Sequence, residues 1–187
     1  MNIAVYSGSF NPLHIGHLAI IKHMLEEADF DMVYLIVSPK NPLKDSISSA
    51  SAHDRFASAV SAVNRHFTPD SNVKVDDIEL NMPEPHYTIR TLDALRQREP
   101  QNSFTFVMGA DSLADIRRWK DYTRILSEFG VAVFPRKGHD LTTIKTDLLK
   151  ENPIYKIQII NAPLVAVSST QIREGLAKGE DISHLLM

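Results

Sequence analysis

Two histidines, His14 and His17, stand three residues apart in the stretch "SGSFNPLHIGHLAII", directly behind a short apolar run that is typical of a strand. Pro12 excludes an earlier helix and helical spacing starts at Ile15, so both imidazoles fall at a helix N-terminus and share one face. Imidazole N–H groups beside the positive end of a helix suit phosphate oxygens. The pattern predicts a phosphate site between the first strand and the first helix.

The residues around the histidines favour the same interpretation. Gly8 ends the apolar run, where a residue without a Cβ permits a tight turn or the close approach of a ligand. We expect the backbone N–H groups of Ser9 and Phe10 to be free. Gly16, between the histidines, leaves room for a ligand to lie against the helix.

A second candidate anion site lies near the end of the chain, in "SSTQIR". Ser168 followed three residues later by Gln171 forms a capping box, which stabilises any helix by about 1 kcal/mol. A capped helix N-terminus also binds anions, and Ser169, Thr170 and Arg173 add hydroxyls and a bidentate donor. The structural and functional interpretations are compatible.

Short β-branched or aromatic runs alternate with longer stretches of helical periodicity, which predicts a parallel sheet. The expected strands are 2–6, 32–37, 73–75, 104–108, 131–134 and 156–160, and the expected helices are 15–27, 52–67, 88–98, 121–129, 141–150 and 169–178. The predicted fold is α/β, a Rossmann-like three-layer sandwich with a parallel sheet and helices on both faces. We expect residues 1–187 to form a single domain. Neither G-x-G-x-x-G nor G-x-x-x-x-G-K-[ST] is present, so a different phosphate site is needed.

Composition narrows the classes of function. The net charge is −3 over 187 residues, and the sequence contains no block of like charges. Both observations argue against nucleic acid or an anionic membrane as a partner. The absence of cysteine excludes disulfides, thiolate metal sites and cysteine nucleophiles. We find no signal peptide or membrane span at sequence level, and we expect a cytoplasmic protein.

The two anion-site motifs resemble the signatures of one superfamily. "GSFNPLHIGH" is similar to the G-x-F-x-P-x-H-x-G-H motif of nucleotidyltransferases that share H-x-G-H with class I aminoacyl-tRNA synthetases, and "SSTQIR" is similar to their second signature. The resemblance implies that His14 and His17, with the N–H groups of Ser9 and Phe10, hold the α- and β-phosphates of ATP. It implies that the start of the last helix holds the β- and γ-phosphates through Ser169, Thr170 and Arg173.

Further stretches resemble the nicotinate-nucleotide adenylyltransferase family over nearly the whole chain. "SPKNPLK" is similar to a proline-containing loop ending in lysine, which implies Lys44 as a catalytic phosphate contact. "HYTIRTL" is similar to S-Y-T-I-D-T-L, with His86 and Arg90 as departures. The resemblance implies that Tyr87 and Thr88 help to recognise the pyridine mononucleotide.

Two more elements follow in the order of that family. "MGADSLADIRRW" resembles a G-x-D element followed by a tryptophan, which implies that Gly109 and Asp111 lie by a ribose and that Trp119 stacks on the pyridine ring. "VFPRKG" is similar to V-x-x-R-x-G and implies Arg136 as a nucleotide-phosphate contact, although Lys137 replaces a common proline.

The resemblance implies transfer of an adenylyl group from ATP to nicotinate mononucleotide, giving deamido-NAD and pyrophosphate. The sequence offers no clustered carboxylates, so we expect Mg²⁺ to be carried by ATP and no metal site on the protein. Two alternatives stay open: pantetheine-phosphate adenylyltransferase, whose motif has threonine at the position of His14, and a non-catalytic nucleotide-binding module. We favour nicotinate over nicotinamide mononucleotide, which differs from it by one group.

Overall fold

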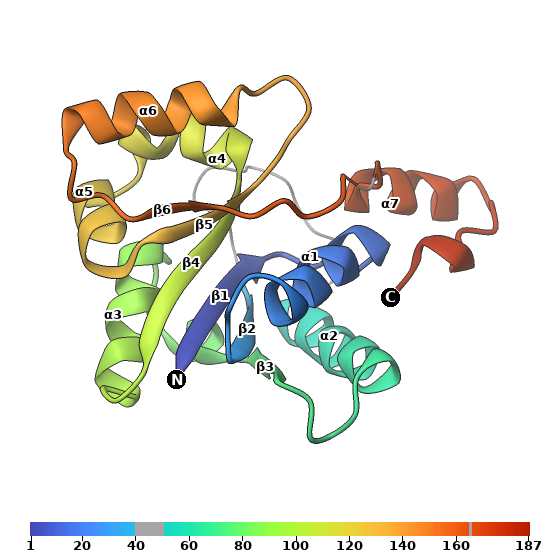
Figure 1. Ribbon diagram of the computed structural model, residues 1–187. Coiled ribbons are helices and arrows are strands. Elements are labelled where there is room, and N and C mark those ends of the chain that lie inside the picture. The colour runs from blue at the N-terminus through green and yellow to red at the C-terminus, as the bar shows by residue number, and fades with distance from the viewer. Residues whose placement is uncertain (40–50, 165) are drawn as a thin grey trace.

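Six parallel strands form one sheet in the order β3-β2-β1-β4-β5-β6, in a computed structural model that describes residues 1–39, 51–164 and 166–187 (Figure 1). The strands are β1 (Asn2–Gly8), β2 (Met32–Val37), β3 (Val73–Asp76), β4 (Ser103–Gly109), β5 (Val131–Phe134) and β6 (Ile157–Ile159). Their β-branched and aromatic residues are buried on both sides, as a parallel sheet covered by helices requires.

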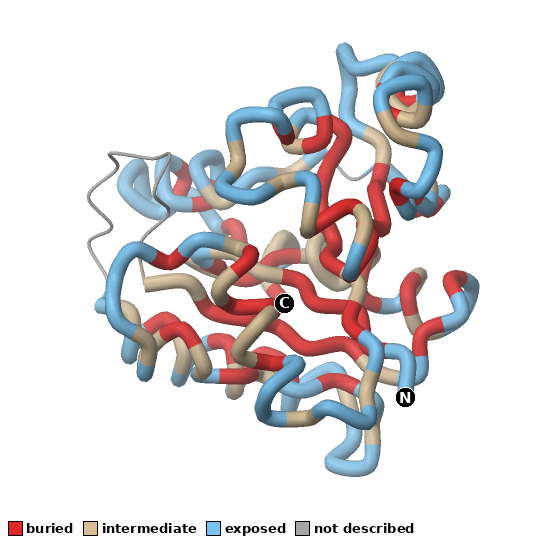
Figure 2. The backbone as a smooth tube through the Cα atoms, turned by 90° about the vertical axis from the view of Figure 1, so that its left-hand side faces the viewer, coloured by how far each residue is buried: buried red, intermediate tan, exposed pale blue. Residues whose placement is uncertain are grey.

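Helices cover both faces of the sheet, which confirms the predicted three-layer sandwich (Figures 1 and 2). One face packs against α3 (Thr88–Arg98), α4 (Ala110–Ala114), a π-helix (Ile125–Phe129) and α6 (Leu141–Glu151). The other packs against α1 (Ile15–Glu26) and α2 (Ala52–His66), while α7 (Ser169–Ala177) extends beyond them. Successive side chains of β1 point to opposite faces of the sheet and so into different hydrophobic cores. Ile3 and Val5 belong to one core, and Ala4 and Tyr6 belong to the other.

The order of the strands places a crevice beside β1. From β1 the chain adds β2 and then β3 on one side, and it returns to place β4 on the other side. The connections after β1 and β4 therefore leave the sheet in opposite directions. In open parallel sheets, ligands bind at this switch point, outside the carboxyl ends of the strands.

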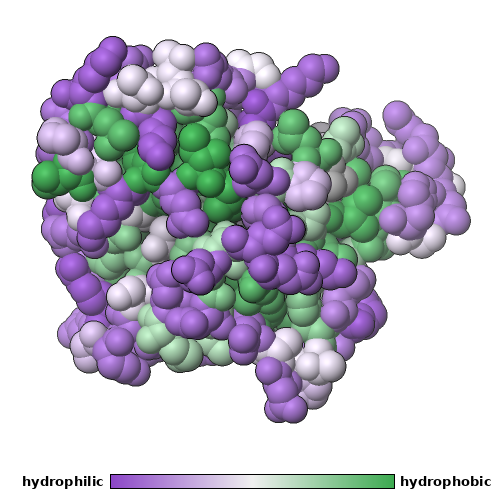
Figure 3. Space-filling model, in the orientation of Figure 1, coloured by the Kyte–Doolittle hydropathy of each residue, from purple (hydrophilic) through white to green (hydrophobic). Residues whose placement is uncertain are grey.

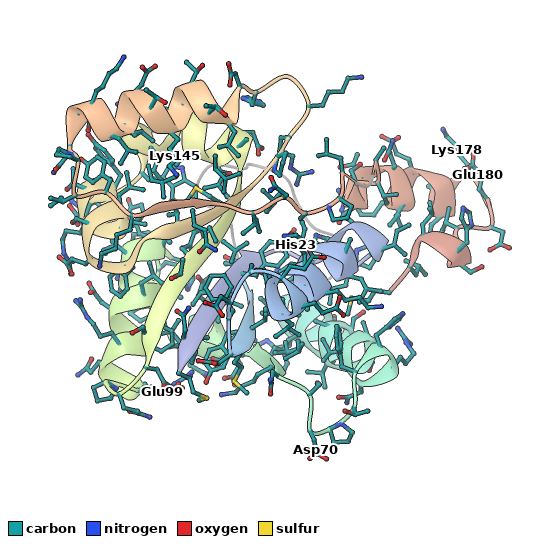
Figure 4. The ribbon with its side chains drawn as sticks, viewed as in Figure 1. His23, Asp70, Glu99, Lys145, Lys178 and Glu180 are labelled. Carbon is teal, nitrogen blue, oxygen red and sulfur yellow. The ribbon has the colours of Figure 1, made fainter. Side chains whose placement is uncertain are left out.

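Hydrogen bonds and ion pairs link the end of α3 to the sheet. Glu99, labelled in Figure 4, accepts hydrogen bonds from Tyr34 and Asn102, both at 2.9 Å. Arg98 donates two hydrogen bonds to the buried Asp76, at 3.0 and 2.7 Å. The chain's own polar groups therefore hydrogen-bond to both carboxylates. Figure 3 shows a mostly hydrophilic surface, with apolar side chains gathered beneath α6 and beside α7.

The predicted elements agree with the structure except along 110–129. The helix predicted over 121–129 is present as a single turn, α5 (Tyr122–Arg124), that leads directly into the π-helix, and Asp121 precedes it with a φ of 50°. The short α4 was not predicted, nor were the 3-10 turns at 78–81, 116–118 and 183–185. Such elements span too few residues to produce a helical periodicity.

Among the residues that the structure describes, no helix combines the length and the apolar character that crossing a membrane requires.

Candidate active site

A cavity of about 990 Å³ opens at the carboxyl edge of the sheet, beside β1. Most residues that the sequence singled out line it, although they come from five separate segments. They are Gly8, Ser9, Phe10, His14, Gly16, His17, Thr88, Gly109, Asp111, Trp119, Arg136, Ser168, Ser169, Thr170 and Arg173. Tyr87 is exposed and is not part of the lining. Lys44 lies outside the described residues.

His14 and His17 form a reciprocal cap at the start of α1. The Nδ1 atom of His14 accepts a hydrogen bond from the Gly16 N–H at 3.1 Å, and the Nδ1 atom of His17 accepts one from the His14 N–H at 3.1 Å. The two ring centroids lie 3.8 Å apart. Because each Nδ1 accepts, each neutral ring must carry its proton on Nε2. The cap therefore fixes one tautomer and leaves an Nε2–H donor on each histidine.

The surroundings keep both imidazoles uncharged at neutral pH. Burial lowers the pKa of His14 to about 4, with a further contribution from the positive charge of Arg136. Burial also lowers the pKa of His17 to about 3, and His14 and Arg136 add to the effect. Nearby positive charge disfavours the imidazolium, as it would favour an anionic ligand in the same place. Each histidine is thus a neutral hydrogen-bond donor in a cationic environment.

The loop after β1 has the free donors that the sequence predicted. Among the described residues, nothing accepts a hydrogen bond from the N–H of Ser9 or Phe10. Phe10 has a φ of 44°, in the left-handed region that non-glycine residues seldom adopt, and its side chain is buried. Gly8 is needed for packing, because a Cβ there would lie 3.0 Å from the Phe10 ring.

The start of α7 is joined to the same loop across the length of the chain. The Ser169 hydroxyl donates to the Pro12 carbonyl at 3.1 Å, and Arg173 donates to the Asn11 carbonyl at 2.7 Å. The predicted capping box is present, since Ser168 accepts from the Gln171 N–H at 3.2 Å. Two helix N-termini therefore border one cavity, and their partial positive charges favour an anion there.

Aromatic and charged side chains from β4, β5 and the segments that follow them also line the cavity. Trp119 is half-buried and packs edge-to-face on Phe106, with 5.9 Å between the ring centroids. The guanidinium of Arg136 lies over the Phe134 ring, 4.9 Å from its centroid, and its Nε is 3.8 Å from the Asp111 carboxylate. A Cβ at Gly109 would collide with the Asp111 carboxylate and press on Arg136. A larger residue at 109 would therefore displace these two side chains from their present positions.

Three buried polar residues of the lining were not predicted from the sequence as site residues: Arg55, Glu79 and His86. Glu79 accepts a hydrogen bond from the Thr91 hydroxyl at 2.7 Å, and burial raises its pKa. The His86 Nε2 lies 3.0 Å from the Met82 carbonyl oxygen. A signal existed for Arg55, because it precedes Ala59 and Val63 by four and eight residues on the buried stripe of α2.

The described part of the chain holds no group of three or more His, Asp or Glu side chains that could bind a metal ion. A divalent metal here would have to be coordinated mainly by a ligand and by water, as is common for Mg²⁺ bound to phosphates.

Comparisons with known proteins agree with this arrangement. The family model described as "Cytidylyltransferase-like" matches residues 5–175. A protein of Flavobacterium johnsoniae named "Probable nicotinate-nucleotide adenylyltransferase" is 36% identical over 186 residues, covering 100% of this chain and 92% of that protein. A protein of the same name from Flavobacterium psychrophilum is 39% identical, with the same coverage.

Solved structures support the fold. The chain is similar to the Plasmodium falciparum nicotinic acid mononucleotide adenylyltransferase complexed with NaAD, with a TM-score of 0.77 and 23% identity over 97% of this chain and 87% of that one. A structure of the P. falciparum enzyme complexed with APC gives a TM-score of 0.71 and 20% identity over 99% of this chain and 90% of that one.

Proposed function

Because this chain belongs to the cytidylyltransferase-like family and, over its full length, to the nicotinate-nucleotide adenylyltransferases, we propose that it transfers the adenylyl group of ATP to nicotinate mononucleotide. The products are deamido-NAD and pyrophosphate, and the reaction belongs to NAD biosynthesis. The observation that carries the proposal is that the N-termini of two helices, α1 and α7, border the same cavity that Trp119 lines. This arrangement can hold a polyphosphate beside an aromatic base.

The reaction needs no general base. A phosphate oxygen of the mononucleotide, already anionic at neutral pH, forms a bond to the α-phosphorus of ATP, and the bond from that phosphorus to the bridging oxygen breaks to release pyrophosphate. Catalysis then requires in-line positioning and stabilisation of the charge that develops on the phosphates. Fixed donors in a water-poor site perform the second task, since they need no reorganisation during the reaction.

We assign the donors by their position in the cavity. His14 and His17, through their Nε2–H groups, and the N–H groups of Ser9 and Phe10 act on the α- and β-phosphates. The first turn of α7 acts on the β- and γ-phosphates, through Ser169, Thr170 and Arg173. Magnesium carried by ATP would neutralise part of the phosphate charge.

The remaining assignments concern the ribose and the acceptor. Gly109 and Asp111 lie where a ribose would be bound, and Trp119 and Thr88 border the pyridine ring. Arg136 and Lys44 supply positive charge between the two substrates. Tyr87, outside the cavity lining, stays a prediction for the acceptor. We further propose that residues 1–187 work as one domain and that the protein is cytoplasmic.

The test is pyrophosphate release from MgATP with nicotinate mononucleotide, nicotinamide mononucleotide and phosphopantetheine supplied separately at equal concentration. Release with nicotinate mononucleotide alone is expected. Preference for phosphopantetheine would keep the chemistry and overturn the assignment of Trp119. Binding of ATP without release for any acceptor would contradict an enzyme and favour a nucleotide-binding module.

Replacing Trp119 with alanine is expected to raise the KM for nicotinate mononucleotide about tenfold or more, because base–aromatic stacking contributes roughly 1–3 kcal/mol. The KM for ATP should change little. Trp119→Phe is the matched control, since it keeps an aromatic face and the contact with Phe106. Steady-state kinetics with each substrate varied in turn measure both constants. An equal rise in both KM values would point to general damage to the cavity.

A further inference from the structure

Arg55 connects the loops that follow β1 and β2. Its side chain extends from α2 and is 4% exposed. One terminal nitrogen donates to the Ser9 carbonyl at 2.7 Å and to the Ser38 carbonyl at 2.9 Å, and the other donates to the Pro39 carbonyl at 3.0 Å. A guanidinium is suited to this task, because its planar fork reaches several acceptors at once and always carries charge.

The bond to Ser9 determines how the next N–H is presented. In a planar trans peptide the C=O and the following N–H point in opposite directions. When Arg55 holds the Ser9 carbonyl, the Phe10 N–H must therefore point away from Arg55. That N–H has no acceptor among the described residues. The positive φ of Phe10 is unfavourable in isolation, so contacts must maintain it. The buried Phe10 ring and the Arg55 hydrogen bond are such contacts.

We propose that Arg55 is a positioning residue that presents the Phe10 N–H to the phosphates of ATP and fixes this loop to the end of β2. The inference rests on the proposed function only in taking a polyphosphate as the ligand of the loop. Arg55 acts through a backbone group, as the support of an oxyanion-hole donor does. Loss of the support leaves the donor present but misdirected.

One other role for Arg55 makes a different prediction. Its Nε is buried and has no hydrogen-bond partner in the described part of the chain, and the residue lines the cavity. Direct contact of Arg55 with the acceptor substrate would change the KM for the mononucleotide. If Arg55 positions the Phe10 N–H, its loss weakens the binding of ATP and pyrophosphate through their phosphate groups, whichever acceptor substrate is present.

The variants Arg55→Lys and Arg55→Met test the proposal. Lysine keeps the charge but offers one compact donor group, and methionine keeps only the apolar stem. Calorimetric titration with pyrophosphate should give a Kd roughly tenfold higher in both variants, as expected for loss of a hydrogen bond to a charged group. Titration with adenosine, which has no phosphates, should give the wild-type Kd. The kcat should fall, and the KM for the mononucleotide should stay near the wild-type value.

Arg98→Met is the matched control for lost stability. It removes another arginine whose acceptor is buried, Asp76, and the hydrogen bonds of Arg98 to described residues go to Glu99 and Asp76, not to the loop after β1. Circular dichroism and thermal unfolding establish which variants are folded at the assay temperature. The control should bind pyrophosphate as the wild type does. Unchanged pyrophosphate binding in folded Arg55 variants would overturn the proposal, and so would parallel losses for pyrophosphate and adenosine. A change confined to the mononucleotide KM would overturn it in favour of direct contact.

The wild-type protein supplies a second test that no folding defect can affect. In the ¹H–¹⁵N spectrum, the Phe10 amide should shift when pyrophosphate is added and stay in place when adenosine is added. A Phe10 amide unmoved by saturating pyrophosphate would overturn the proposal. This result is separate from the failure of the proposed function, which would appear as absent pyrophosphate release from a protein that still binds pyrophosphate.

Discussion

Replacing His17 with alanine is expected to lower kcat by about a hundredfold or more while the protein stays folded, as found when one preorganised donor to a developing oxyanion is removed. The geometry gives the reason. The His17 Nδ1 is occupied by the His14 N–H at 3.1 Å, so the proton is on Nε2 and can be donated into the cavity. Burial keeps the ring neutral by lowering its pKa to about 3, so the donor is present throughout the physiological range.

His17→Asn separates the two tasks of this residue. Alanine removes the cap on the His14 N–H as well as the Nε2–H donor, and loss of such a cap costs about 1 kcal/mol of stability. Asparagine keeps an oxygen acceptor near the position of Nδ1 but cannot place a donor at the position of Nε2. We therefore expect it to be stable and still strongly impaired. A kcat within about threefold of wild type for His17→Ala would contradict the assigned role, because one such donor is worth far more. Recovery in His17→Asn would assign the effect to the cap.

The second large effect concerns stability at acidic pH. The pKa values of His14 and His17 lie at about 4 and about 3 in the folded state, against an ordinary value of 6.5. Below pH 6.5 the unfolded chain binds protons at both rings and the folded chain does not. Unfolding therefore takes up protons, and the free energy of unfolding falls as the pH drops from 6.5 towards 4. Each ring contributes a slope of up to about 1.4 kcal/mol per pH unit.

The double variant His14→Asn/His17→Asn should remove most of this slope. Asparagine retains a capping acceptor and does not titrate. Denaturant unfolding between pH 5 and 6.5 measures how the free energy of unfolding depends on pH. This range lies above the pH values at which carboxylates with a lowered pKa contribute most, such as Glu128, whose pKa is about 2. His53→Asn is the control, because His53 is exposed on α2. A double variant with the wild-type slope would show that the two rings titrate normally in the folded protein.

Both large predictions depend on features that are partly local in the sequence. The pair His14 and His17 follows a strand and begins a helix, and a spacing of three is the spacing that a capping box requires. Their place at the helix start was predictable for this reason. Their pKa values were not, since burial and the charge of Arg136, more than a hundred residues away in sequence, lower them.

The cavity lining also shows which features a local motif predicts and which depend on tertiary packing. The sequence predicted Thr88 and Tyr87 together as acceptor contacts, because they are neighbours in one motif. Tyr87 is the N-cap of α3 and is exposed, whereas Thr88 begins the helix and lines the cavity. The direction of a side chain at a helix start depends on how the helix packs on the sheet, which a motif does not specify.

By itself, the sequence determined the alternation of strands and helices, the sandwich class and the place of the two capped helix starts, because these depend on residues within one or two turns of each other. Only the tertiary structure decided that "SSTQIR" meets the first loop, through hydrogen bonds from Ser169 to Pro12 and from Arg173 to Asn11 that span 157 and 162 residues. It also decided that Arg55 holds Ser9 across 46 residues. Such contacts follow from the order in which strands join the sheet, and local periodicity carries no information about that order.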